Sequence, residues 1–288
     1  MTERLDVRKT YKLYINGGFP RSESGRSYAV MTPDGSFIAN VAQASRKDAR
    51  DAVVAARGAF GGWSRATAYN RGQILYRIAE MMEGRRGQFA DEVQAAEGHD
   101  RMTAEHIVDA TVDRWVWYAG WSDKITSVLG SANPVAGPYF NFSVPEPTGV
   151  VAAVAPQESS LLGLVSVIAP ILVSGNTAVV IASTARPTPA VTLTEALATS
   201  DLPGGVLNLL TGEVGEITPW LASHADVNAL DLTGVSDGPL ATSLAQAAAD
   251  TVKRVHTPSP QADWFADPGL DRLRAFVETK TVWHPMGT

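Results

Sequence analysis

Few side chains in this sequence could carry out chemistry, and cysteine is absent from all 288 residues. That absence removes thiolate nucleophiles, disulfides and cysteine metal sites together. The five histidines are scattered without metal-ligand spacing, so we expect no metal site. Glu158, beside Gln157, follows an apolar run and could act as an acid or base in a cleft. The more common role of such a residue is a solvated loop carboxylate.

Composition restricts the class of protein. Acidic residues exceed basic ones, the formal net charge is -6 and no basic stripe is visible, so we expect no nucleic-acid partner. The N-terminus has charge but no apolar h-region, which argues against a secretory signal. The longest apolar run, residues 161–173, falls short of the roughly 18 residues that a membrane span needs. We therefore expect a soluble, cytoplasmic protein without a membrane partner.

The first half of the chain predicts hairpins followed by helices. Residues 11–43 alternate apolar and polar types around Gly and Asp-Gly turn signals. Ser45, with Asp48 three residues later, has the spacing of a helix capping box. Apolar periodicity then predicts one helix over 70–97 and another over 104–129. The latter carries Trp115, Trp117 and Trp121, which favour core packing over a ligand cage; the pattern leaves open whether they pack internally or at an interface.

The pattern of apolar and polar residues changes near residue 146. Short, almost wholly apolar runs predict strands, and longer amphipathic or apolar segments between them predict helices. The strands are expected at 150–155, 178–181, 206–210 and 229–232, and the helices at 161–173, 189–199, 217–224 and 239–251. This alternation is typical of a parallel sheet covered on both faces, in a doubly wound α/β fold of the Rossmann type.

The C-terminal segment changes again. Prolines 258, 260 and 268 indicate a linker, and residues 275–283 then alternate as a β-strand. One face of this strand carries Val277, Thr279, Thr281 and Trp283. No partner strand is evident nearby in the sequence, which invites pairing with the edge of another sheet.

Several segments, in this order, resemble the aldehyde dehydrogenase superfamily. They are residues 14–18 (YINGG), 146–151 (EPTGVV), 169–177 (APILVSGNT), 202–212 (LPGGVLNLLTG), 226–234 (DVNALDLTG), 253–255 (KRV) and 278–283 (ETKTVW). The resemblance implies N-terminal hairpins, helices and the start of an oligomerisation hairpin over 1–145. It implies a Rossmann-type NAD-binding domain over 146–257, and a linker with an oligomerisation strand over 258–288. The resemblance further implies that the family's catalytic domain is missing as a block, as in the non-catalytic second half of double-domain members.

The catalytic positions depart from the family pattern. Aldehyde oxidation in this family uses a cysteine thiolate, an asparagine that stabilises the oxyanion and a glutamate base. The thiolate has no counterpart here. The segment with the asparagine aligns with Gln157 and Glu158, and Pro258 stands at the place of the base. The resemblance therefore implies a pseudoenzyme that cannot oxidise an aldehyde by itself.

The nucleotide-binding positions depart as well. The lysine and glutamate that hold the adenosine ribose in the family correspond to Ile181 and Thr184. The phosphate-binding turn keeps Gly234 and Ser236, but Pro239 lacks an N–H and Asp237 adds negative charge. We expect a vestigial groove with no bound cofactor, so that NAD(P) enters only through a partner subunit.

Three hypotheses about function follow. The first is a non-catalytic subunit whose tail strand docks on a full-length aldehyde dehydrogenase in a hetero-oligomer, where the partner carries out NAD-dependent oxidation. The second is a nucleotide or metabolite sensor that uses the Gly234 turn. The third is an enzyme with a repurposed cleft around Glu158.

Overall fold

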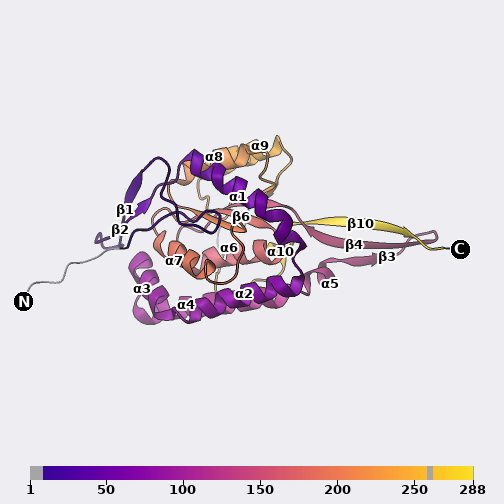
Figure 1. Cartoon of the computed structure of the whole chain (residues 1–288), viewed down its shortest axis with the longest axis horizontal. Coiled ribbons are helices and arrows are strands. Elements are labelled where there is room, and N and C mark those ends of the chain that lie inside the picture. The colour runs from indigo at the N-terminus through magenta and orange to yellow at the C-terminus, as the bar shows by residue number, and fades with distance from the viewer. Residues whose placement is uncertain (1–8, 258–261, 288) are drawn as a thin grey trace, which may run out of the picture.

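The computed structural model describes residues 9–257 and 262–287. A parallel sheet of five strands, in the order β7-β6-β5-β8-β9, forms the centre (Figure 1). Its strands are β5 (Val150–Val154), β6 (Thr177–Ile181), β7 (Leu207–Leu210), β8 (Ala229–Asp231) and β9 (Arg254–His256). The doubly wound α/β prediction is confirmed. The fifth strand, β9, was not predicted, because its residues Arg254, Val255 and His256 form no apolar run.

Helices cover both faces of this sheet, which explains why its strands are apolar throughout. On one face Val151 and Ala153 pack against α6 (Leu162–Val173) and α7 (Thr188–Leu197). On the other face Val150, Ala152 and Val154 pack with α1 (Arg46–Arg65), α8 (Val214–Ser223) and α9 (Gly238–Ala249). None of the helices in the described ranges is long and apolar enough to cross a membrane.

The expected capping box starts α1. The Ser45 hydroxyl accepts from the Asp48 N–H, and the Asp48 carboxylate accepts from the Ser45 N–H at 2.8 Å. Before it, β1 (Ser27–Met31) and β2 (Phe37–Ala42) form an antiparallel hairpin around an Asp-Gly turn. The prediction of hairpins in this part of the chain is confirmed.

The outer helical layer is more segmented than the sequence predicts. Residues 70–97 form two helices, α2 (Ala68–Glu83) and α3 (Arg86–Glu97), because Gly84 caps the first and the chain turns. Residues 104–129 also divide, into α4 (Arg101–Trp121) and α5 (Ile125–Leu129). The break after Trp121 redirects the chain from the body of the molecule into a projecting hairpin.

The three tryptophans of α4 lie in or against the protein's own core. Trp115 is fully buried, and Trp117 and Trp121 are half-buried and packed on the same cluster. The Trp117 ring meets Tyr118 edge-on at 4.8 Å and Trp121 at 5.4 Å. This arrangement fits core packing, the interpretation that the sequence favours.

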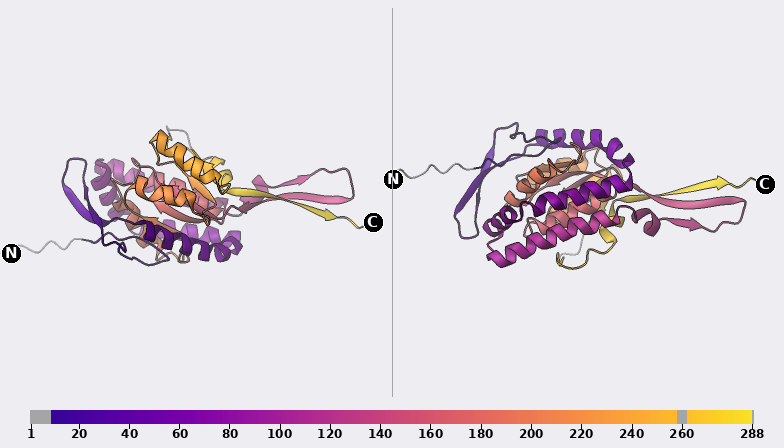
Figure 2. Two further views of the ribbon diagram at one scale, coloured as in Figure 1. Left: turned by 90° about the horizontal axis from the view of Figure 1, so that it is seen from above. Right: turned by 60° about the horizontal axis from the view of Figure 1, so that its bottom comes forward.

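A second sheet extends away from the body, and we call it the arm (Figure 2). It has three antiparallel strands in the order β10-β4-β3, namely β3 (Ser131–Asn133), β4 (Tyr139–Pro147) and β10 (Val277–Pro285). The sequence shows no nearby partner for the tail strand, and the structure pairs all of β10 with β4 of the same chain. This pairing joins residues about 140 positions apart, which sequence periodicity does not report.

Candidate functional site

The topological switch point of the sheet lies between β5 and β8. From β5 the chain passes to β6 and β7 on one side and then to β8 and β9 on the other. In open α/β sheets, ligands bind where the carboxyl ends of two such strands diverge. Residues predicted from the sequence gather at this edge. Gln157 follows β5, Ile181 and Thr184 lie at and after the end of β6, and Gly234 follows β8.

The polar groups around Gln157 are engaged in internal hydrogen bonds. Its side-chain amide donates to the Ala155 carbonyl at 2.8 Å and accepts from the Thr184 N–H at 3.0 Å. The Thr184 hydroxyl donates to Gly212 at 2.9 Å, and the Ser183 hydroxyl donates to the Gln157 carbonyl at 2.8 Å. Ile181 is buried. These bonds join the ends of β5, β6 and β7 and engage the side chains of Gln157, Ser183 and Thr184.

Gly234 has a packing role at this edge. Its N–H donates to the Val154 carbonyl at 2.9 Å, and a Cβ here would overlap the carbonyl oxygen of Ala155. The turn after it leads to α9, where the Asp237 side chain caps the helix by accepting from the Leu240 N–H at 3.2 Å. Ser236 precedes this cap and Pro239 lies in the first turn. A carboxylate cap and a missing N–H make this helix start a poor fit for a pyrophosphate.

Glu158 lies on an exposed loop near the same edge. Nη1 of Arg186 donates to the backbone carbonyl of Glu158 at 2.6 Å, and the Glu158 carboxylate has no hydrogen-bond or ion-pair partner among the described residues. Glu97 fixes the loop by accepting from the N–H and hydroxyl of Ser160 at 2.7 and 2.6 Å. An exposed carboxylate without a second catalytic group beside it resembles a solvated loop residue more than an acid or base. Pro258 lies outside the described residues.

A buried ion pair on β8 was not predicted from the sequence. Asp231 is completely buried, and its Oδ2 lies 3.1 Å from Nη1 of Arg272. Arg272 belongs to α10 (Asp271–Ala275), and its Nη2 also donates to the Thr233 hydroxyl at 3.2 Å. A buried charge is tolerated when it is paired and hydrogen-bonded. The sequence did contain a signal for this ion pair, since Asp231 is a lone charged residue in an otherwise apolar predicted strand.

This ion pair holds the segment that returns from the sheet to the arm. Arg114 of α4 holds the same segment from the other side by donating to the carbonyls of Trp264 and Ala266 at 2.6 and 3.0 Å. Burial lowers the pKa of the Arg114 guanidinium and raises the pKa of the nearby Tyr118 to about 12. At the end of the segment, the Asn176 side chain donates to the Phe276 carbonyl at 2.8 Å. The base of β10 is therefore rigidly attached to the body.

The arm carries the four predicted interface residues on one face of β10. In the register of the sheet, Thr281 lies opposite Ser143 and their hydroxyls hydrogen-bond at 2.8 Å. Trp283 is 58% exposed and meets Tyr139 edge-on at 5.7 Å. Val277 and Thr279 continue this face toward the body. Among the described residues, β10 pairs with β4 alone, so its other edge is unpaired.

Comparison with known proteins identifies the family. A family profile described as "Aldehyde dehydrogenase family" matches residues 19–258. Mitochondrial 10-formyltetrahydrofolate dehydrogenase of Mus musculus is 34% identical over 239 residues, which are 80% of this chain and 26% of that protein. Retinal dehydrogenase 2 of Homo sapiens is 33% identical over 241 residues, 82% of this chain and 46% of that protein.

Solved structures agree with this match. PnpE from Pseudomonas sp. WBC-3 has a TM-score of 0.81 at 29% identity, over 86% of this chain and 50% of that one. HpcC from Thermus thermophilus also has a TM-score of 0.81 at 29% identity, over 86% of this chain and 47% of that one. The chain therefore spans half or less of these relatives, and its sequence contains no cysteine to act as the catalytic nucleophile. By profile, sequence and fold, it belongs to the aldehyde dehydrogenase family.

Proposed function

We propose that this chain is a non-catalytic subunit that docks, through its arm, on a full-length aldehyde dehydrogenase subunit. The partner carries out NAD-dependent aldehyde oxidation, and this chain stabilises it or shapes its substrate entrance. The observation that carries the proposal is the unpaired edge of β10, nine residues long, on an arm that projects from the body (Figure 1).

An unpaired strand of this length favours a protein partner. It presents a row of backbone N–H and C=O groups that can pair with a strand of another chain. The side chains of the arm add to this, since Trp283 and Phe140 are 58% and 52% exposed. Exposed aromatic residues beside a free strand edge are typical of an interface. The rigid attachment of β10 also keeps the entropic cost of docking low.

The chemistry of the switch-point edge supports the non-catalytic part of the proposal. The thiohemiacetal step needs a thiolate, and the sequence has none. A carboxylate at Glu158 would repel an oxyanion at that position. The groups near Gln157 and Thr184 already bond to one another, which favours a partner subunit as the holder of NAD(P).

Native mass spectrometry of the tagged full chain, purified under mild conditions from its own cells, tests the proposal. We expect a complex with a chain of full aldehyde dehydrogenase length whose peptides include the catalytic cysteine. A lone monomer or a homodimer would contradict the proposal. In that case calorimetry with NAD, NADP and CoA would test the sensor hypothesis, and loss of a measured activity in Glu158→Gln would be needed for the enzyme hypothesis.

A further inference from the structure

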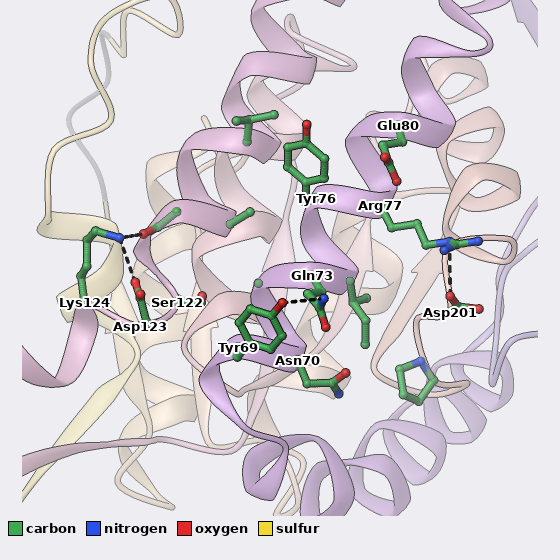
Figure 3. Close-up of a pocket in the computed structure, with 16 residues that line it drawn as sticks. Tyr69, Asn70, Gln73, Tyr76, Arg77, Glu80, Ser122, Asp123, Lys124 and Asp201 are labelled. Carbon is green, nitrogen blue, oxygen red and sulfur yellow. Dashed lines mark hydrogen bonds and ion pairs between the residues drawn. The ribbon is translucent and has the colours of Figure 1, made fainter.

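Two surfaces adjoin the arm, and they lie at its opposite edges. A hollow of about 880 Å³ between α2 and α4 leads through α5 to β3, the edge strand on one side (Figure 3). Two ion pairs in this hollow join side chains of the chain itself, namely Lys124 with Asp123 and Arg77 with Asp201. The edge strand on the other side is β10. The hollow therefore lies away from a strand that pairs with β10, and the residues of β10 itself define that contact.

The main-chain groups of β10 face two directions in turn. Before the strand, the carbonyl of Phe276 accepts from the N–H of Thr148 at 3.2 Å. After it, the N–H of Met286 donates to the carbonyl of Pro138 at 2.9 Å. The register between these two bonds is unbroken, and every second residue of an antiparallel strand faces the same neighbour. Even-numbered residues of β10 therefore bond to β4, and the odd-numbered residues of 277–283 direct their N–H and C=O groups to the open edge.

A row of hydrogen-bonded side chains crosses the arm and ends at this edge. On β3, the Ser131 hydroxyl donates to Oδ1 of Asn133 at 2.8 Å. Nδ2 of Asn133 then donates to Oδ1 of Asn141 and to Oγ of Ser143 on β4, at 2.6 and 2.9 Å. The Ser143 oxygen is thus an acceptor, so its own proton is available to Thr281 of β10 at 2.8 Å. This leaves the Thr281 hydroxyl proton without an acceptor among the described residues, at the edge of the sheet.

The open edge of β10 lacks the features that usually protect a free strand. The odd-numbered residues of 277–283 are uncharged, and the register with β4 contains no bulge. The acidic and basic residues of β10 are Glu278 and Lys280, and they form ion pairs with Arg254 and Glu146. Free edges in other proteins are protected by unpaired charges, prolines or bulges. The edge therefore fits a strand whose facing side chains are uncharged and can form hydrogen bonds.

We propose that the strand of the catalytic subunit that pairs with β10 places an uncharged hydrogen-bonding side chain (Ser, Thr, Asn or Gln) opposite Thr281. The row that begins at Ser131 then continues into the partner. This inference rests on the proposed docking function and adds the register and the chemistry of the partner strand. A slip by one residue brings a side chain of the opposite face to Thr281. An apolar side chain there leaves the covered hydroxyl without an acceptor, so Thr281 selects against other strands and other registers.

Substitutions of equal shape test this inference. Thr281→Val replaces the hydroxyl by a methyl group, and Thr279→Val makes the same change on the same face of β10, outside the hydrogen-bonded row. Each tagged full chain is titrated with the catalytic subunit that the native purification recovers, and the dissociation constant and melting temperature are measured. Ser143→Ala, alone and combined with Thr281→Val, tests whether the row acts as a unit. A photo-crosslinking residue at Val282 identifies the partner strand and its register.

We expect Thr281→Val to raise the dissociation constant about tenfold and Thr279→Val no more than about twofold, because only the first leaves a covered group without its hydrogen bond. Thr281→Ser keeps the hydroxyl and should restore most of the affinity. Ser143→Ala should weaken docking of the otherwise unmodified chain but add nothing to Thr281→Val. Melting temperatures should change little, since the bond between Ser143 and Thr281 is exposed.

Equal dissociation constants for Thr281→Val and Thr279→Val overturn the inference and leave docking through the arm intact. A crosslink that places an apolar or charged residue opposite Thr281, or that maps to a helix of the catalytic subunit, overturns it as well. Failure of the unmodified chain to recover any catalytic subunit rejects the docking function and this inference together.

Discussion

The sheet of the body and the sheet of the arm differ in how much of their surface the chain itself covers. In the body, every residue of β5 and β6 is buried, because helices of the same chain cover both faces. In the arm, β10 has no fully buried residue, and both of its faces and one of its edges are accessible. The body satisfies its own apolar and backbone groups. The arm leaves a large share of its side-chain and backbone groups accessible.

Because of this difference, we expect substitutions in the body and in the arm to affect different properties of the protein. Residues in the body should affect folding strongly and docking only through folding. Residues at the tip of the arm should show the reverse, because they contribute little to the folded monomer but much to an interface. Both properties meet at the junction between the two regions, where Arg272 of α10 pairs with Asp231 of β8.

The largest effect is expected from the ion pair at this junction. Arg272→Leu leaves the buried Asp231 carboxylate without its cation, and breaking such a pair costs about 3–5 kcal/mol. Chemical denaturation should show a large drop in the unfolding midpoint at an unchanged m-value. The double variant Asp231→Leu with Arg272→Leu removes both charges and should recover most of the loss. If the double variant is as unstable as the single one, packing of α10 and not charge pairing explains the effect.

Much of the body could be predicted from the sequence because its signals are local. An uninterrupted apolar run such as 150–154 indicates a strand covered on both faces, and the capping residues Ser45 and Asp48 mark a helix start within four residues. The arm depends on a long-range match of β10 with β4, and alternation within 275–283 shows that a strand exists but not where it pairs. The positions of breaks such as Gly84 were also missed, because the apolar stripe continues across them.

The residues of the candidate sites also differ in how far the sequence could predict them. The sequence located Gln157 and Thr184 near the switch point through family motifs, and the structure adds that they bond to each other. It could not reveal that Asp231 meets Arg272, 41 residues away, although a charge inside an apolar strand implies some partner.

An intermediate effect is expected at the tip of the arm. Trp283→Ala should weaken docking by about 2 kcal/mol, roughly 30-fold in the dissociation constant, because a large exposed aromatic beside a free edge is a typical hot spot. The loss in unfolding free energy should stay below about 1 kcal/mol, since the ring packs mainly against Tyr139. Met102→Ala, a change at an even more exposed apolar residue at the distant start of α4, should alter neither quantity. A fall in melting temperature without a change in docking would reverse the roles assigned to body and arm.

The smallest effect concerns pH at the junction. Burial lowers the pKa of His256 below its usual value of 6.5; the neighbouring Asp231 and Asp271 oppose this shift and Arg272 reinforces it. The unfolded chain therefore binds a proton at His256 more readily than the folded chain. Stability contributed by the neutral imidazole is present above about pH 6.5 and is lost as the pH falls below that value, by at most about 1.4 kcal/mol per pH unit.

Unfolding midpoints measured between pH 7.5 and about 5 in His256→Gln should show a shallower decline than those of the unmodified chain. His224 provides a separate comparison, because burial also lowers its pKa, and its replacement by Gln should remove a different part of the slope. The pH dependence of docking tests more directly whether the junction connects the body to the arm. If His256 acts by anchoring α10, acid should loosen β10 and docking together in the unmodified chain and less so in His256→Gln. An identical pH dependence in both proteins would mean that the junction does not transmit the change and that the arm is independent of the body.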